Sequence, residues 1–97
     1  FASGDLKLPP VVLTEMLSSP NVSATLRESL EKIELLPLTD GYWRRAGLAR
    51  AALRRAGLKA KTADSLIAQS CIDHDVALIT RDADFRHFAK HCGLRLA

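Results

Sequence analysis

Three aspartates in the second half of the sequence stand where acidic side chains could hold a metal ion. Asp64 falls in the first turn of a predicted helix and shares a stripe with Ala68 and Cys71, which should face the core. Asp82 and Asp84 directly follow an apolar segment of strand type. In open parallel α/β sheets, ligands bind at the carboxyl ends of strands. An acid on a buried stripe, such as Asp64, is costly unless it is paired or binds a cation. Because Asp82 and Asp84 at the strand end could converge with Asp64, we treat all three as candidate catalytic residues.

Each of these acids also has a purely structural interpretation. Asp64 could act at the helix N-terminus, where an acid favours the helix dipole. Asp82 or Asp84 could form a turn and cap the helix that follows. Glu15 is a further candidate, because it falls inside the apolar arc of a predicted helix over residues 11–17; the alternative is a surface glutamate. Position alone leaves both interpretations open for each residue.

A carboxylate cluster without histidine favours a hard cation, Mg²⁺ or Mn²⁺. Such an ion can activate water and stabilise the charge of a phosphodiester under in-line attack, so no protein nucleophile is required. Other arrangements are weaker. His87 and His91 lie four residues apart beside Cys92, but no CxxC or second histidine pair completes a zinc site. The sequence has no Gly-rich phosphate loop and no GxSxG motif.

The charge of the chain is unevenly spread. Residues 1–40 carry three basic and six acidic side chains, whereas residues 41–97 carry eleven basic and five acidic ones. A basic half suggests a polyanion partner, such as nucleic acid, or an acidic protein. We take four arginines as candidate contacts to RNA or a protein partner: Arg44, Arg50, Arg54 and Arg81. The alternative for the helical arginines is a solvated helix face.

The elements that must position these residues alternate between helix and strand. Helices are predicted over residues 11–17, 23–32, 40–56, 62–74 and 84–91, with Ser23 and Thr62 as N-terminal caps and with Gly57 and Gly93 ending the third and fifth helices. Strand-type segments are predicted over residues 6–8, 33–38, 76–80 and 94–96. The continuous apolar run of residues 76–80 suits a strand that is buried on both faces of a parallel sheet. This order predicts an α/β fold with a parallel sheet.

Length and composition bound the class of protein. A chain of 97 residues forms one domain at most, and 47% hydrophobic with 26% charged residues is typical of a globular protein. No apolar run approaches the ~20 residues of a membrane span, and no secretory signal is visible. Two cysteines, Cys71 and Cys92, do not make a disulfide framework. We expect both to be reduced, in a cytoplasmic protein.

Two paired motifs give the sequence a family resemblance. The stretch Thr62-Ala-Asp-Ser-Leu-Ile-Ala68 and the later Leu78-Ile-Thr-Arg-Asp-Ala-Asp-Phe85 resemble the PIN-domain family, especially the VapC toxins. Pro10-Val-Val-Leu-Thr-Glu15 is similar to the Pro-x-Val-x-x-Glu helix of that family. The resemblance implies a three-layer α/β/α sandwich with a parallel sheet, and a metal-dependent endoribonuclease.

The resemblance also assigns roles and partners. Carried over by position, Glu15, Asp64 and Asp82 would be metal-site acids, and Asp84 a fourth or supporting acid. It implies a toxin of a type II toxin–antitoxin system that cleaves RNA, is neutralised by a small antitoxin and forms a homodimer. The alternatives are a PIN nuclease of RNA processing or decay, and a non-catalytic PIN-like module that binds RNA or protein.

One feature of the family pattern is missing from the sequence. Members of the family begin with a strand that ends in an acid, in a Val-Asp-Thr or Val-Asp-Ser sequence. Asp5 does not match this acid, because no apolar strand precedes it. We therefore expect residues 1–97 to be a single PIN-like domain that is N-terminally incomplete, with the gap filled by a separate N-terminal peptide, a swapped strand or an antitoxin segment.

Overall fold

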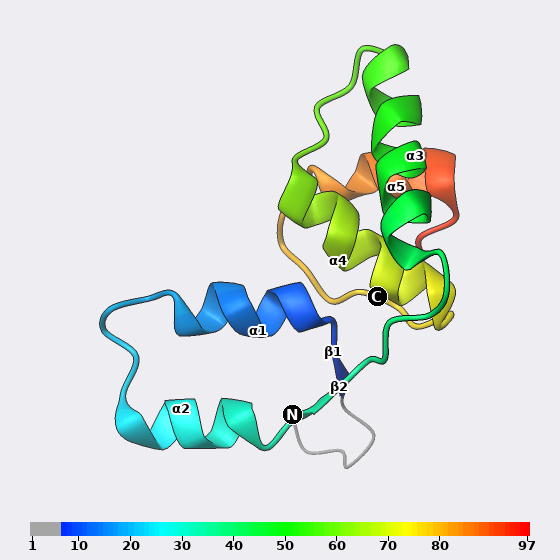
Figure 1. The fold of residues 1–97 in the computed structure, drawn as a ribbon. Helices are drawn as coiled ribbons and strands as arrows, with labels where there is room; N and C mark the ends of the chain where they lie inside the picture. Colours follow the sequence, from blue (N-terminus) through cyan, green and yellow to red (C-terminus); the bar gives the residue numbers. More distant parts are fainter. Residues whose placement is uncertain (1–6) are drawn as a thin grey trace. The chain divides into compact units, whose positions relative to one another are not determined.

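The computed structural model describes residues 7–97, which belong to two compact units divided between Pro37 and Leu38. The first unit contains strand β1 (Lys7–Leu8), helix α1 (Pro10–Leu17), helix α2 (Ala24–Glu31) and strand β2 (Glu34–Leu35). The second unit contains helices α3 (Tyr42–Arg55), α4 (Thr62–Asp73) and α5 (Phe85–Cys92). Figure 1 shows these elements along the chain.

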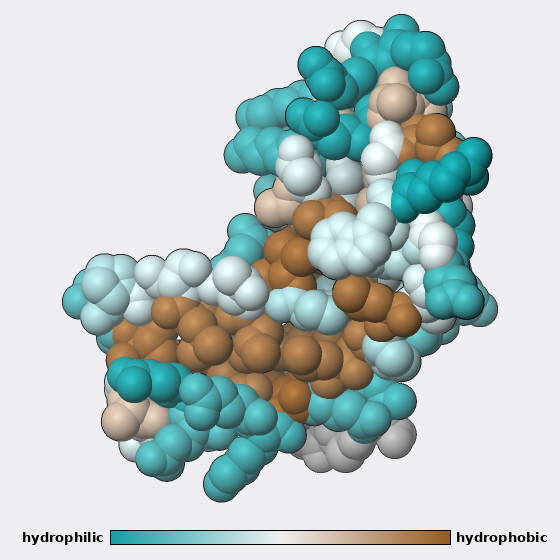
Figure 2. All heavy atoms as spheres, viewed as in Figure 1, coloured by the Kyte–Doolittle hydropathy of each residue, from teal (hydrophilic) through white to brown (hydrophobic). Residues whose placement is uncertain are grey.

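In the first unit, two helices follow one another along the chain, and a short strand precedes and another follows this helix pair. Proline at the first position of α1 has its backbone angle already set for a helix, and Ser23 caps α2 by accepting a hydrogen bond from the Leu26 amide. β1 pairs with β2 in parallel, with Leu8 opposite Leu35. Figure 2 shows apolar side chains gathered between α1 and α2. Leu8, Leu30 and Leu36 are buried, so this unit has a small core of its own.

In the second unit, the three helices pack against one another around α4 (Figure 1). α4 contains no glycine or proline, and its small side chains let the neighbouring helices approach closely. The helix α4 is buried on most of its circumference. Its Leu66 carbonyl accepts a hydrogen bond of 2.6 Å from the hydroxyl of Tyr42, the buried first residue of α3. The inner face of α5 is formed by two buried side chains, Phe85 and Phe88. Left-handed Gly57 and Gly93 follow the ends of α3 and α5, as the sequence predicts.

One predicted element is wrong. Residues 76–80 were expected to form a strand buried on both faces, but Ile79 is 79% exposed and Val76 is exposed as well. Within residues 7–97, Leu78 forms a single parallel bridge to Leu96 instead of a longer ladder. An apolar run predicts burial only if other segments cover both of its faces. The predicted strands over residues 6–8 and 33–38 are confirmed in shorter form, as β1 and β2.

The remaining helix predictions are confirmed within a few residues. α3 begins at Tyr42 after a left-handed Gly41, slightly later than predicted. Thr62 was predicted to cap α4 but is its first residue, after Lys61 at the cap position. Within residues 7–97, the structure contains no helix that is long and apolar enough to cross a membrane.

Candidate metal centre

Asp64 is positioned by the first turn of α4. It is the third residue of the helix, where its charge favours the positive end of the helix dipole. Its side chain belongs to the buried side of α4, with the whole residue only 9% exposed, and Ala68 and Cys71 on the same stripe are fully buried. The prediction that Asp64 shares a core-facing stripe is therefore confirmed. A carboxylate at this depth carries a large desolvation cost, which a bound cation would offset.

Asp82 and Asp84 are positioned by a hydrogen-bonded loop that leads into α5. The Thr80 hydroxyl accepts a hydrogen bond of 3.1 Å from the Asp82 amide. Asp82 Oδ1 in turn accepts one of 2.9 Å from the Asp84 amide. The burial of Phe85 fixes the start of α5 directly behind this loop. Thr80 therefore helps to hold this loop, although only the acids of its sequence motif were predicted to have a role.

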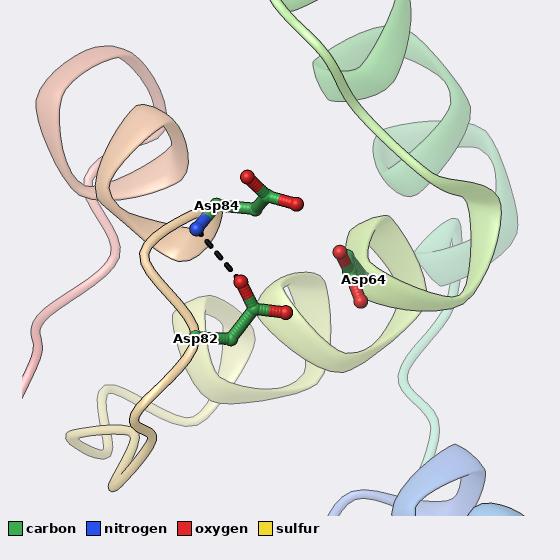
Figure 3. A group of neighbouring side chains, drawn as sticks. All are labelled: Asp64, Asp82 and Asp84. Atoms are coloured by element: carbon green, nitrogen blue, oxygen red, sulfur yellow. Dashed lines mark hydrogen bonds between the residues drawn. The ribbon is translucent and has the colours of Figure 1, made fainter.

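The three carboxylates converge on one point (Figure 3). One oxygen from each of Asp64, Asp82 and Asp84 can be chosen so that all three lie within 4.8 Å of one another. Oxygens bound to Mg²⁺ at about 2.1 Å lie at most about 4.2 Å apart, so small side-chain rotations would bring all three to one ion. Asp84 is the residue before α5, yet its side chain makes no capping hydrogen bond. The capping interpretation is therefore not supported for Asp84, whereas the predicted turn at Asp82 is present, because Asp82 Oδ1 accepts a hydrogen bond from the Asp84 amide.

A lysine lies beside this cluster. Lys59, in the loop between α3 and α4, has its Nζ 3.8 Å from Asp84 Oδ2. The side chain of Lys59 is largely exposed, so the pair is loose and weakly stabilising. Lys59 was not among the predicted site residues, because nothing in the local sequence pattern indicates which acid it meets.

Glu15 was predicted to join the same metal site. It lies in α1, in the first unit, and its side chain is exposed. The three acids that the structure brings together all belong to the second unit. The assignment of Glu15 to the metal site therefore stays a prediction.

The candidate RNA-binding arginines differ in their surroundings. Arg50 donates a hydrogen bond of 2.8 Å from Nε to the Ala60 carbonyl, so it also ties the α3–α4 loop to α3. Arg44, Arg54 and Arg81 are exposed. Their contact with RNA or a protein partner stays a prediction.

A different arginine forms the strongest ion pair of the second unit. Arg45 donates to both carboxylate oxygens of Asp73, at 3.1 and 2.7 Å, and Gln69 and Thr39 donate to the same carboxylate. The Arg45 guanidinium beside Asp73 holds the pKa of that carboxyl below its usual range. This network joins the start of α3 to the end of α4. The two residues are 28 positions apart, so no local sequence signal could have paired them.

Comparison with known proteins decides the family. The PIN-domain family model matches residues 2–91, which is nearly the whole chain. The chain belongs to the PIN-domain family. The prediction drawn from the paired motifs is therefore confirmed, and with it the α/β fold class with parallel strand pairing.

Solved structures share this PIN fold. One belongs to VapBC-5 of Mycobacterium tuberculosis, a member of the VapBC family of toxin–antitoxin systems. Its TM-score is 0.71 at 23% identity, and the match covers 93% of this chain and 79% of that one. Another is VapBC2 of Rickettsia felis bound to a DNA fragment from their promoter, with a TM-score of 0.65 at 22% identity, covering 91% and 70%. A search of curated proteins returned no match.

Proposed function

We propose that this PIN-domain protein is a metal-dependent endoribonuclease, the toxin of a toxin–antitoxin system. The observation that carries the proposal is the convergence of Asp64, Asp82 and Asp84 at the start of α4 and the loop before α5. Membership of the PIN family supports a nuclease, because its VapC members are nucleases.

The donor set fits a hard divalent cation. All three candidate ligand atoms are carboxylate oxygens, which Mg²⁺ and Mn²⁺ prefer, and no soft ligand is among them. Asp82 Oδ1 accepts a hydrogen bond from the Asp84 amide, which leaves Asp82 Oδ2 to bind a metal ion. When bound, Mg²⁺ or Mn²⁺ would supply Lewis-acid stabilisation of the phosphodiester and would lower the pKa of a coordinated water.

The protein's own residues would orient the reacting groups. Asp64 supplies a ligand from a rigid, buried helix, whereas Asp82 and Asp84 supply ligands from a loop that Thr80 stabilises. Ligands held in this way lose little freedom when the ion binds, which favours a defined geometry for in-line attack. Glu15 would be a further ligand, as its place in the family motif implies.

The partners in this proposal are RNA and an antitoxin. The solved structures that share the fold come from VapBC toxin–antitoxin systems, which supports an antitoxin partner. The excess of basic side chains after residue 40 supports a polyanionic substrate. We retain the homodimer and the cytoplasmic setting as parts of the same proposal.

The test is cleavage of a structured RNA in vitro with Mg²⁺, with Mn²⁺ and with a chelator. We expect cleavage that requires the metal and is lost in Asp82→Asn. Asp75→Asn, an exposed acid outside the cluster, is the control and should cleave normally. RNA binding without cleavage under any metal would contradict the nuclease proposal and favour a non-catalytic module. Cleavage without toxicity on expression, and without a neutralising antitoxin, would favour RNA processing or decay.

A further inference from the structure

We propose that one flank of α3 binds single-stranded RNA, with the Trp43 indole stacking on a base. This flank comprises Trp43, Gly47, Arg50 and Arg54, and we call it the α3 flank. Their 4-3-4 spacing places the four residues along one side of the helix. The inference rests on the proposed function only for its choice of RNA as the ligand.

Trp43 is an exposed but supported ring. The residue is 64% exposed, which is unusual for so large an apolar side chain. Its ring meets the ring of Tyr42 edge-on, with centroids 5.1 Å apart and an interplanar angle of 76°. Tyr42 is itself buried and hydrogen-bonded to the Leu66 carbonyl of α4. The indole is thus braced from the core side while another part of its surface faces solvent.

The next position along the flank is open. Gly47 lies one helical turn beyond Trp43, and a Cβ built there would meet nothing within 4 Å. Glycine inside a helix costs about 1 kcal/mol relative to alanine, so its presence is not explained by helix stability. Because no side chain projects there, a flat ligand on the indole would meet bare helix at this position.

Cations follow the open position. At a rise of about 1.5 Å per residue, Arg50 lies about 10 Å and Arg54 about 16 Å along the axis from Trp43. α3 contains no acidic residue, and no described carboxylate forms an ion pair with either arginine. The bond from Arg50 Nε to the Ala60 carbonyl fixes that guanidinium near the helix. A supported aromatic ring followed by unneutralised cations is the combination that single-stranded nucleic acids use.

Charge distinguishes RNA from a second copy of the chain. A symmetric contact through the α3 flank would bury the arginines of both copies with no acidic residue of α3 to pair with them, which carries a desolvation cost. A phosphate backbone would neutralise these arginines instead, and every base offers a π face to the indole.

Trp43 reports directly on this surface, because it is the one tryptophan of the sequence. The experiment titrates the protein, in chelator so that metal-dependent cleavage is off, with an unstructured RNA about 10 nucleotides long. We expect saturable quenching of Trp43 fluorescence, with an affinity that falls steeply as salt rises. Trp43→Ala should weaken RNA binding, measured by anisotropy of a labelled RNA, by about tenfold or more.

Two further variants separate stacking from general charge. Gly47→Leu keeps Trp43 as the reporter and favours the helix, but it fills the open position, so binding should weaken. Leu48→Ala, an exposed α3 residue outside the flank, is the matched control and should bind as the wild type does. Unchanged affinity in both Trp43→Ala and Gly47→Leu would overturn the inference.

The outcomes also separate this inference from the proposed function. Metal-dependent cleavage with no quenching and no effect of Trp43→Ala would support the nuclease function and contradict RNA binding by the α3 flank. Quenching and salt-dependent binding without cleavage under any metal would support RNA binding by the α3 flank and contradict the nuclease function. If Trp43 emission instead shifts with protein concentration in the absence of RNA, together with dimer formation in sedimentation, a second copy covers the flank and the inference is wrong.

Discussion

The two ends of α4 each carry an aspartate, but the two side chains have opposite surroundings. At the C-terminal end, Asp73 meets Arg45, Gln69 and Thr39, which supply hydrogen bonds to both of its oxygens. At the N-terminal end, Asp64 lies with two further acids, Asp82 and Asp84. One end of the helix therefore holds a carboxylate paired with an arginine, and the other end holds a cluster of three carboxylates with Lys59 at its edge.

The difference favours a structural role for Asp73 and the proposed metal-binding role for Asp64. A carboxylate at a helix C-terminus opposes the dipole, and Asp73 is tolerated there because Arg45 binds it in a bidentate way. Asp64 has the favourable end of the dipole, and its carboxylate lies close to those of Asp82 and Asp84, of which Asp84 forms a loose pair with Lys59. Carboxylates that lie this close repel one another, and a cation from solution would relieve the repulsion, which is the property expected of a metal site.

The largest effect should come from removing charge at the two ends in turn. Asp64→Asn changes the shape very little but removes one ligand charge, so RNA cleavage should fall by about a thousandfold, equivalent to about 4 kcal/mol. Asp73→Asn should leave the cleavage rate at saturating metal within a few-fold of wild type under conditions where the protein is folded. Steady-state cleavage assays on both variants check this contrast. An equal loss of cleavage rate in Asp64→Asn and Asp73→Asn would contradict the difference in role between the two acids.

Stability should respond in the opposite order. Asp73→Asn leaves the half-buried Arg45 guanidinium without its carboxylate, so the unfolding temperature should fall by about 5 to 10 °C. Asp75→Asn removes an exposed ion pair with Arg95 and should change the unfolding temperature by much less. Thermal unfolding followed by circular dichroism measures both. A larger loss in Asp75→Asn than in Asp73→Asn would contradict the role given to the Arg45 pair.

The contribution of Asp73 should depend on pH in a defined direction. Its pKa is lowered in the folded protein, chiefly by the hydrogen bonds from Arg45, relative to about 3.9 in an unfolded chain. The stabilisation is therefore fully present at neutral pH and is lost as pH falls below about 4, through the folded pKa. The difference in unfolding temperature between wild type and Asp73→Asn should shrink over that range. A difference that is constant down to pH 3 would be inconsistent with this account.

The smallest effect concerns Lys59, which lies beside the three proposed metal ligands. Its ammonium is close to Asp84 and would repel an arriving metal ion. Lys59→Met should therefore raise the affinity for Mn²⁺ by about two- to fivefold, the scale of an exposed ion pair. Lys90→Met, an exposed lysine at the far end of α5, is the control and should leave the affinity unchanged. A weaker affinity in Lys59→Met would show that Lys59 does not compete with the metal.

Local patterns were sufficient for the helices and for part of the candidate site. Helix caps and breaks are short-range features, so Ser23, Gly57 and Gly93 marked helix ends correctly. The helical stripe placed Asp64 on the buried face of α4, and the paired motifs placed Asp82 and Asp84 beside it. These are properties of segments of a few residues or of the sequence pattern of the PIN-domain family.

Contacts between distant segments could not be predicted in the same way. The apolar composition of residues 76–80 predicted burial, but Ile79 is exposed, because burial depends on what covers a segment. The partners Arg45 and Asp73 each look like ordinary surface charges in the sequence. Their pairing follows from the packing of α3 on α4, which only the three-dimensional structure reveals.

Binding of Mn²⁺ by the purified protein tests the central claim most directly. Calorimetric titration of metal-free wild type, Asp64→Asn and Asp73→Asn compares the two ends of α4 in one experiment. We predict saturable binding in wild type and in Asp73→Asn, and an affinity lower by more than about tenfold in Asp64→Asn. Equal Mn²⁺ affinity in wild type and Asp64→Asn, with both proteins folded, would contradict the assignment of this carboxylate cluster as a metal site.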